Sequence, residues 1–257
     1  MDKKLTAALL IIGNEILSGR TQDTNTSWIA TKLAERGIKL TEVRVVPDIV
    51  DAITSAVNEL SPRVEYLFTT GGIGPTHDDI TSETMAKIFG VKWVLNSDAR
   101  AALLQYYQSE ADLTPARLKM AHIPEGARLI ENPVSGAPGF QIENVYVMAG
   151  VPRIMQAMLD GILPALESGH PILSNTITCD LQESAIAEKL SDIQDKYPTV
   201  DIGSYPHFRM GALGLSLVLK SNDNDNLHAA TYEVVEMVRS FGQEPIAISI
   251  KSSENPK

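Results

Sequence analysis

Runs of apolar residues alternate with segments of helical spacing along the first two thirds of the chain. Residues 7–12 form a continuous apolar run that ends at Gly13, which is typical of a strand buried on both faces. Between residues 23 and 36 apolar side chains recur at helical spacing, and Gly37 follows as a helix-ending glycine would. The opening unit is therefore predicted to be a strand, a loop and a helix.

The same alternation continues to residue 168. Further strands are expected at residues 38–46, 66–70, 91–95, 128–130 and 145–149. Helices are expected at 49–60, from the end of the 71–79 loop to 89, and at 98–110 and 152–166. The strands 128–130 and 145–149 should bracket a hairpin-like turn region. Because alternating strands and helices are joined by parallel crossovers, residues 1–168 are predicted to form a three-layer α/β/α domain with a mostly parallel sheet.

A second, smaller domain is predicted after the linker Gly169-His170-Pro171, where the periodicity resets. Its expected strands are residues 172–178, 200–203, 213–219 and 245–250, and its expected helices are 183–196 and 226–241. This βαββαβ order is typical of the split βαβ arrangement and indicates an α+β domain over residues 171–250. The polar tail 251–257 is predicted to be disordered.

Composition narrows the classes of partner. The formal net charge of −10 argues against a nucleic-acid partner, but backbone N–H groups and a divalent cation can still hold a small phosphorylated ligand. Cys179 is the only cysteine, so an internal disulfide and a cysteine-based zinc site are excluded, and we expect it to be a buried small hydrophobe. No stretch approaches the ~18 apolar residues of a membrane span. We therefore expect a cytoplasmic protein with no membrane partner.

The most informative chemical stretch is the glycine loop between Thr69 and Thr81, whose sequence is TTGGIGPTHDDIT. It lies between a predicted buried strand and a helix, and ligands bind at this edge of open α/β sheets. Glycines there let the backbone approach a phosphate and direct several N–H groups toward it. A tight turn without a ligand is the alternative. The candidate ligand-binding residues of this loop are Thr70, Gly71, Gly72, Gly74, Pro75 and His77, the last as a phosphate contact or proton shuttle.

Three aspartates are candidate metal ligands. Asp78 and Asp79 would repel a phosphate directly, but they suit a hard divalent cation that the phosphates share. Asp23 follows the loop after the opening strand, which can face the glycine loop across the crevice, so Asp79 and Asp23 are the candidate catalytic residues. Helix capping is the alternative for each aspartate, with Thr81 a competing cap beside Asp79. The opening loop adds Gly13, Glu15 and Asn25 as candidate ligand contacts.

A third element comprises the segment 135–140 and the tripeptide Gly150-Val151-Pro152. Pro152 suits the first turn of a helix, where free N–H groups form an anion site. Gly136, Gly139, Gly150 and Pro152 are therefore candidate ligand-binding residues, and structural turns are the alternative.

At these three loops the sequence resembles the molybdopterin-binding domain family, in particular the branch related to the N-terminal part of competence/damage-inducible protein A (CinA). The matching segments run in order from Gly13 to Pro152, although Met148-Ala149 stand where the family usually has Leu-Pro. The second region is similar to the small domain that follows in that branch, through Glu183-Ser184 and the segment 203–206. The deamidase domain of full-length CinA proteins and the flavin-adenylating domain of some eukaryotic proteins are not expected in this chain.

The resemblance implies a function as well as a fold. The broad superfamily binds molybdopterin and adenylates or metallates it, with an aspartate at the position of Asp79 serving the metal–nucleotide chemistry. The CinA-like branch implies a divalent-metal-dependent pyrophosphatase acting on ADP-ribose, FAD or a related dinucleotide, with Mg²⁺, Co²⁺ or Mn²⁺ as cofactor and K⁺ as a further candidate ion. The alternative is a non-catalytic molybdopterin- or nucleotide-binding protein linked to molybdenum cofactor biosynthesis. Relatives also imply a homo-oligomer, either a dimer or a trimer.

Overall fold

The computed structural model describes residues 5–209 and 212–250 of the 257-residue chain. The predicted disordered tail, 251–257, lies outside the described residues. The chain divides into two compact units, residues 1–169 and residues 170–257, and each is described by itself.

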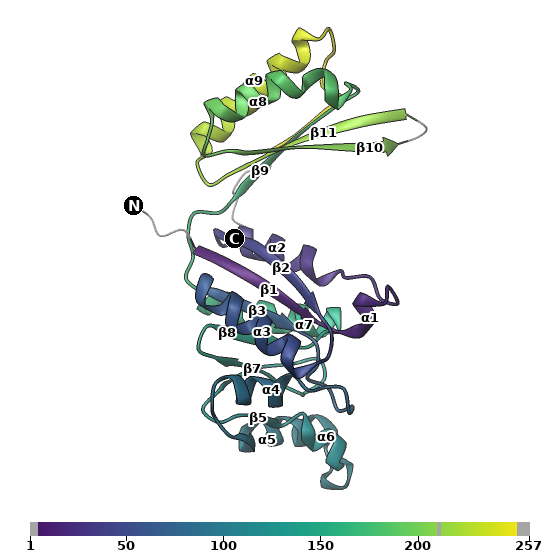
Figure 1. Cartoon of the computed structure of the whole chain (residues 1–257), viewed down its shortest axis with the longest axis vertical. Helices are drawn as coiled ribbons and strands as arrows, with labels where there is room; N and C mark the ends of the chain where they lie inside the picture. The colour runs from purple at the N-terminus through teal and green to yellow at the C-terminus, as the bar shows by residue number, and fades with distance from the viewer. Residues whose placement is uncertain (1–4, 210–211, 251–257) are drawn as a thin grey trace. The chain divides into compact units, whose positions relative to one another are not determined.

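A six-stranded sheet forms the centre of the first unit (Figure 1). Its strands lie in the order β2 (Ile38–Val46), β1 (Leu5–Ile12), β3 (Tyr66–Thr70), β8 (Val145–Met148), β7 (Gly139–Ile142) and β6 (Arg128–Ile130). The first four strands are parallel, whereas β7 runs antiparallel to both of its neighbours. The predicted mostly parallel sheet is confirmed.

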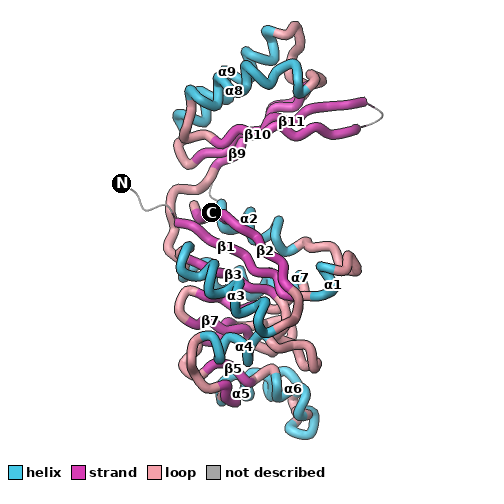
Figure 2. The backbone as a smooth tube through the Cα atoms, in the orientation of Figure 1, coloured by secondary structure: helices cyan, strands magenta, loops and turns pink. Residues whose placement is uncertain are grey.

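Helices cover both faces of this sheet, as the alternation of side chains along β1 requires. Leu9 and Ile11 belong to the core shared with α2 (Asn25–Glu35) and α7 (Pro152–Ile162). Leu10 and Ile12 belong to the opposite core, which α3 (Val50–Leu60) and α4 (Thr81–Ile88) complete. Because both faces are apolar, the strand reads as a continuous hydrophobic run. The three-layer α/β/α prediction is therefore confirmed, and Figure 2 shows these layers.

Several short elements of the first unit were not predicted. The 91–95 segment forms a shorter strand, β4 (Trp93–Leu95), which pairs with the unpredicted β5 (His122–Pro124) instead of joining the main sheet. The turn region expected between residues 130 and 145 contains β7. Two helices were also missed, α1 (Asn14–Leu17) and α6 (Pro115–Lys119), while α5 (Ser97–Tyr107) lies where a helix was expected. Segments of three to five residues are too short to show a period of their own.

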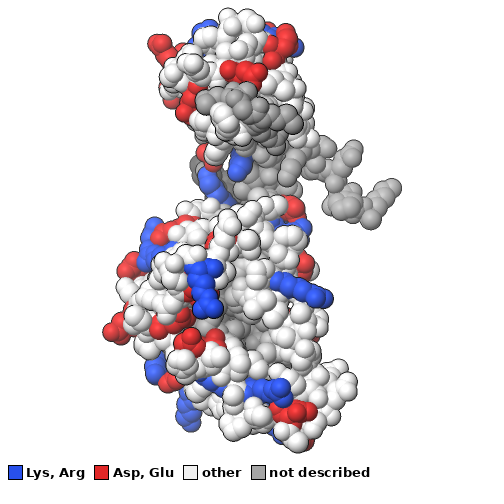
Figure 3. All heavy atoms as spheres, turned by 90° about the vertical axis from the view of Figure 1, so that its right-hand side faces the viewer, with Lys and Arg blue, Asp and Glu red and all other residues white. Residues whose placement is uncertain are grey.

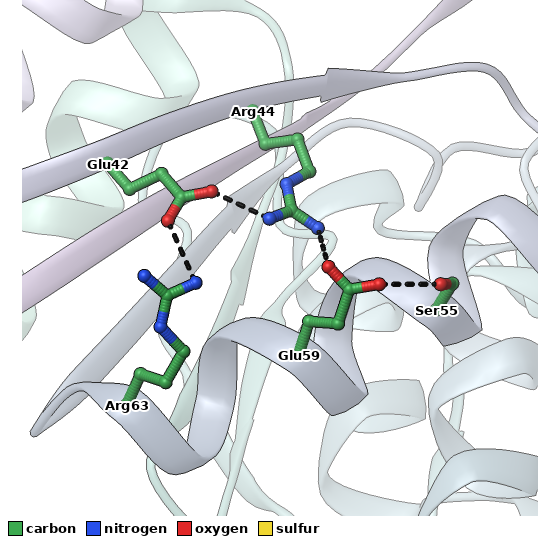
Figure 4. Close-up of polar contacts among 5 residues, drawn as sticks. All are labelled: Glu42, Arg44, Ser55, Glu59 and Arg63. Carbon is green, nitrogen blue, oxygen red and sulfur yellow. Dashed lines mark hydrogen bonds and ion pairs between the residues drawn. The ribbon is translucent and has the colours of Figure 1, made fainter.

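Charged side chains of the edge strand β2 pair with each other, with α3 and with Arg63 (Figure 4). The Arg44 guanidinium contacts Glu42 at 2.7 Å and Glu59 of α3 at 2.7 Å, and Arg63 contacts the other oxygen of Glu42 at 3.3 Å. Ser55 donates to Glu59 at 3.0 Å. The hydrogen bond from Arg44 lowers the pKa of Glu59 below its ordinary value. Charges of this kind hinder the pairing of an edge strand with another chain.

The second unit is a four-stranded antiparallel sheet with two helices. Its elements follow the order β9 (Leu173–Cys179), α8 (Glu183–Lys196), β10 (Asp201–Arg209), β11 (Ala212–Ser221), α9 (Asn224–Ser240) and β12 (Ala247–Ile250). The strands lie in the order β10-β11-β9-β12. Ile177, Leu217 and Val234 are among the side chains of its core, and Cys179 is buried there as a free thiol, as predicted. The expected smaller α+β domain is thus confirmed as part of the fold class.

Among the described residues, no helix is long and apolar enough to span a membrane.

Candidate functional site

Three loops predicted to carry the site follow neighbouring strands. The loops after β1, β3 and β8 emerge at the same edge, because these strands are adjacent and parallel. A Cβ atom added at Gly71 would lie 2.1 Å from the carbonyl oxygen of Ile12, and one added at Gly150 would lie 3.3 Å from the Cα of Gly71. Gly71 also donates its N–H to the carbonyl oxygen of Met148 at 3.1 Å. The structure therefore brings the three loops together.

The backbone of the glycine loop excludes side chains at Gly71 and Gly72. These two residues have positive φ angles of 104° and 69°, and a Cβ at Gly72 would lie 2.1 Å from Thr81 Oγ1. A Cβ at Gly74 would lie 2.6 Å from Asp79 Oδ2, the end of a side chain that can move away. Backbone conformation and packing thus explain Gly71 and Gly72 without a ligand, and the phosphate role of all three glycines stays a prediction.

Buried hydroxyl groups surround this loop. The Oγ1 atoms of Thr69, Thr70 and Thr81 have no hydrogen-bond partner in the described part of the chain, and the three residues are at most 1% exposed. The Oδ1 atom of Asn25 is likewise buried and unpartnered there. Buried polar groups are normally satisfied by protein, water or a ligand. The carboxyl end of β3 thus offers unused hydrogen-bonding capacity beside the loop.

Both aspartates of the loop contact Thr76. The Thr76 N–H donates to Asp79 Oδ2 at 2.8 Å, and Thr76 Oγ1 lies 2.5 Å from both Asp79 Oδ2 and Asp78 Oδ1. A hydroxyl has one hydrogen to donate, so it serves one carboxylate at a time. The hydrogen bond from Thr76 lowers the pKa of Asp78. Two carboxylates therefore converge on one hydroxyl group.

Helix capping was the alternative role for the aspartates, and the structure answers it differently at α4 and at α2. Helix α4 begins at Thr81 with no side-chain cap, so neither Asp79 nor Thr81 caps it. Asp23 Oδ1, in contrast, accepts hydrogen bonds from the N–H groups of Asn25 at 2.9 Å and Thr26 at 3.2 Å, at the start of α2. The Asn25 side chain then donates to the carbonyl oxygen of Gly150 at 2.8 Å. Asp23 thus has a structural role in holding α2 near the loop after β8.

A protein-only metal centre is not preassembled. Among the described residues, no group of three or more histidine, cysteine, aspartate or glutamate side chains is placed to hold a metal ion. Asp78 and Asp79 share the Thr76 turn, while Asp23 binds backbone at the start of α2, and a common metal ion for the three aspartates stays a prediction. Adjacent strand ends bring loops together, but the carboxylate directions depend on local turns.

The remaining predicted residues are placed mainly by packing. The Glu15 carboxylate folds back over Gly13, where a Cβ would lie 2.6 Å from Glu15 Oε1. Gly136 packs against Tyr106 of α5, and a Cβ at Gly139 would lie 2.3 Å from the Val147 carbonyl oxygen. Pro75, His77 and Pro152 are exposed, with 98% of the His77 side chain accessible and Pro152 in the first turn of α7.

Sequence reasoning missed two charged residues of this edge. Asp48 follows β2, and its Oδ2 accepts a hydrogen bond from the Asn14 N–H at 2.9 Å. Its position just after a predicted strand could have marked Asp48 as a candidate site residue. Lys119 is the last residue of α6, and its ammonium group donates to the carbonyl oxygen of Thr76. No local pattern connects two residues that are 43 positions apart.

A narrow pocket of about 10 Å³, room for roughly one water molecule, adjoins the loop. Asp79 and Lys119 contribute its charged groups, and Trp93, Pro138 and Phe140 contribute apolar lining. The Trp93 indole N–H is held by Ser82 Oγ at 3.0 Å and by the His122 carbonyl oxygen at 2.8 Å. Figure 3 faces the edge that carries the strand ends, and basic and acidic side chains are interspersed on the first unit there.

Comparison with known proteins covers both units. Residues 8–168 match the family described as "Probable molybdopterin binding domain", and residues 171–243 match "FAD synthase, middle domain". A protein of Archaeoglobus fulgidus is 35% identical over 198 residues, which cover 77% of this chain and 84% of that protein. A CinA-like protein of Desulfosudis oleivorans is 36% identical over 211 residues. These residues cover 77% of this chain and 51% of that longer protein.

A solved structure shares the first unit's fold. The crystal structure of the protein CinA, of unknown function, from Thermoplasma acidophilum is 38% identical and has a TM-score of 0.59, covering 63% of this chain and 99% of that one. The family match spans more than half of the residues, and it includes all three loops at the carboxyl ends of β1, β3 and β8. The chain therefore belongs to the molybdopterin-binding domain family, in its CinA-like branch.

Proposed function

We propose that the first unit is a divalent-metal-dependent nucleotide pyrophosphatase that acts on ADP-ribose, FAD or a related dinucleotide. The observation that carries this proposal is the convergence of Asp78 and Asp79 on Thr76, beside the glycine loop. Two carboxylates at the mouth of an anion-accepting loop are suited to a cation that the ligand's phosphates share.

The donor set fits such a metal ion. Mg²⁺ is commonly held by one or two carboxylates together with substrate phosphates and water, so a cage of three protein ligands is not needed. Asp78 and Asp79 supply hard oxygen atoms, and the mutual repulsion of their charges falls when a divalent cation binds between them. Mg²⁺, Co²⁺ or Mn²⁺ would neutralise the pyrophosphate and activate the attacking water.

The residues of the loop would then bind and orient the ligand. Gly72 and Gly74 carry no side chain, so a phosphate oxygen can approach their N–H groups, while Gly71, whose N–H donates to Met148, shapes the turn. The match of the second unit to a domain of FAD synthase supports a ligand of the nucleotide class. That match alone names no substrate.

A second candidate function is binding without turnover. The glycine loop by itself favours it, because backbone N–H groups can bind a phosphate without activating water. In this case the chain would be a molybdopterin- or nucleotide-binding protein linked to molybdenum cofactor biosynthesis.

The test is a substrate and metal panel with the purified chain. ADP-ribose, FAD and coenzyme A are each incubated with Mg²⁺, Co²⁺ or Mn²⁺, with and without K⁺, and released adenosine phosphates are separated by chromatography. We expect AMP from ADP-ribose or FAD, and no product after chelation of the metal. Tight stoichiometric binding without any product would select the second candidate. Neither product nor binding would overturn both.

Two further properties are carried over from the resemblance as proposals. We propose a homo-oligomer, a dimer or trimer, which light scattering on the eluting protein would measure. A cytoplasmic location is also proposed, and cell fractionation would test it.

A further inference from the structure

We propose that Lys119 is a ligand-contacting residue of this site, whose ammonium group binds the phosphate that the glycine loop receives. The inference rests on the proposed function, because it needs a phosphorylated ligand at that loop. It places the positive charge that faces the anion on α6, a helix outside the three predicted loops.

Lys119 differs from the other cations of α5 and α6 in what it contacts. Arg100 pairs with Glu110 at 2.5 Å, and Arg117 lies 3.6 Å from Asp112 and 4.1 Å from the Tyr107 ring centroid. These contacts are local in the sequence. Lys119 extends to the carbonyl oxygen of Thr76 in the glycine loop.

The ammonium group is close to the groups that the proposed reaction uses. Lys119 lines the same pocket as Gly74 and Asp79, and it donates to the carbonyl oxygen of Thr76, whose hydroxyl group contacts both carboxylates. An anion that enters a pocket next to two carboxylates is repelled unless a positive charge is near. Lys119 supplies such a charge at the pocket before any metal arrives.

The ammonium group also has hydrogen-bonding capacity to spare. It carries three N–H donors, and the carbonyl oxygen of Thr76 uses one of them. The other two can point at phosphate oxygens while the first still holds the turn that carries Asp78 and Asp79. Lys119 thus links ligand binding to the position of both carboxylates.

Neighbouring contacts hold the short helix in place. Thr114 Oγ1 caps α6 by accepting from the Arg117 N–H at 3.3 Å. At the other end, His122 Nδ1 lies 2.9 Å from the carbonyl oxygen of Leu118, and the His122 ring packs on Trp93 with centroids 4.9 Å apart. The backbone that carries Lys119 is therefore fixed next to the pocket wall.

The experiment measures Mg–ADP binding to the full chain by calorimetry for three substitutions. Lys119→Gln keeps a donor for Thr76 but removes the charge, Lys119→Met removes both, and Lys119→Arg keeps both. Lys87→Met is the matched control, since Lys87 pairs with Glu83 on exposed α4 surface at 2.8 Å. Adenosine is the uncharged probe, and the thermal midpoint of each variant reports folding.

We expect Lys119→Gln and Lys119→Met to weaken Mg–ADP binding by about tenfold or more, the loss of one charge-assisted contact, with Lys119→Arg recovering most of it. Adenosine binding and the Lys87→Met control should not change. If Lys119→Gln binds Mg–ADP as tightly as the wild type while Lys119→Met binds it more weakly, Lys119 only positions the turn. That result would overturn the phosphate contact. Equal affinity in all variants would overturn the inference while leaving the proposed function intact. If the wild type binds no Mg–ADP, the inference falls, while AMP release in the substrate panel still decides the proposed function.

Discussion

The backbone at Gly71 passes so close to Ile12 that a Cβ atom on Gly71 would lie 2.1 Å from the Ile12 carbonyl oxygen. Real Cβ atoms essentially never approach another heavy atom so closely, and here the neighbour is backbone, which cannot rotate away. The turn after β3 is therefore built directly against the end of β1, and a side chain on Gly71 would force these two strand ends apart.

Gly71→Ala is expected to destabilise the first unit by at least about 3 kcal/mol, because it adds this overlap to the strain of a positive φ of 104°. Gly90→Ala is the matched control: Gly90 has a φ of 66° but nothing within 4 Å of its Cβ position, so it should cost only about 1 kcal/mol. Both tryptophans, Trp28 and Trp93, lie in the first unit, so their fluorescence during urea unfolding reports on that unit alone. Equal losses of unfolding free energy in the two variants would contradict the close approach of Gly71 to Ile12.

Asp79→Ala should abolish turnover without unfolding the chain. The substitution removes a metal ligand of the proposed site, for which a loss of at least about a hundredfold in kcat is expected, but only about 1 kcal/mol of stability from its bond to the Thr76 N–H. Steady-state release of AMP and urea unfolding are measured on the same sample. Asp160→Ala, at an exposed position of α7, serves as the control and should retain full activity. Activity in Asp79→Ala close to that of the wild type would remove Asp79 from the mechanism.

Thr76→Val is expected to raise the pKa of Asp78 toward its ordinary value of 3.8, because the hydrogen bond from Thr76 is the main cause of its lowered pKa. A carboxyl whose folded pKa is lowered stabilises the fold above its unfolded pKa, and this contribution is lost as the pH falls through the folded pKa. In the variant the contribution should therefore be smaller at every pH above the ordinary pKa, because the folded and unfolded pKa values lie closer together. Carbon-detected NMR titration of the aspartate side chains measures the shift, with Asp112 as an internal reference. An unchanged Asp78 titration would show that Thr76 does not set it.

Thr231→Val tests the second unit. Asn175 donates to Thr231 Oγ1 at 2.9 Å, both residues are buried, and Thr231 donates in turn to the Leu227 carbonyl oxygen at 2.6 Å. Valine would leave the Asn175 amide without its acceptor, which should cost about 1–3 kcal/mol. Thr231→Ser keeps the hydroxyl and should cost less than Thr231→Val. Hydrogen exchange over residues 173–179 and 224–240 measures the loss, and identical protection in wild type and Thr231→Val would contradict it.

The long elements could be predicted because the spacing of apolar residues in each one reflects which of its faces are buried. The unbroken apolar run of β1 reflects burial on both faces, and α2 and α3 show the helical period of a face packed on the sheet. In the second unit the expected strand at 200–203 was too short, since β10 pairs with β11 over all nine of its residues. Pairing between strands extends an element beyond the part whose side chains alternate.

The candidate site could be predicted only in part. The glycine loop and the loops after β1 and β8 were found because strand ends and glycines are visible in the sequence, and parallel strands place such loops at one edge. The roles of the aspartates were not visible. Asp23 and Asp79 both have the chemistry of caps and of metal ligands, and only the turn around each decides: Asp23 binds the start of α2, whereas Asp79 binds Thr76.

Lys119 shows the physical reason for this limit. Periodicity and glycine positions report interactions between residues that are near one another in the chain, so they were sufficient for the layers, the sheet and the edge at which the three loops meet. The contact from Lys119 to Thr76 exists because β5 pairs with β4 and brings α6 back beside the glycine loop. Contacts of this kind depend on how separate elements pack, and only the tertiary structure decides them.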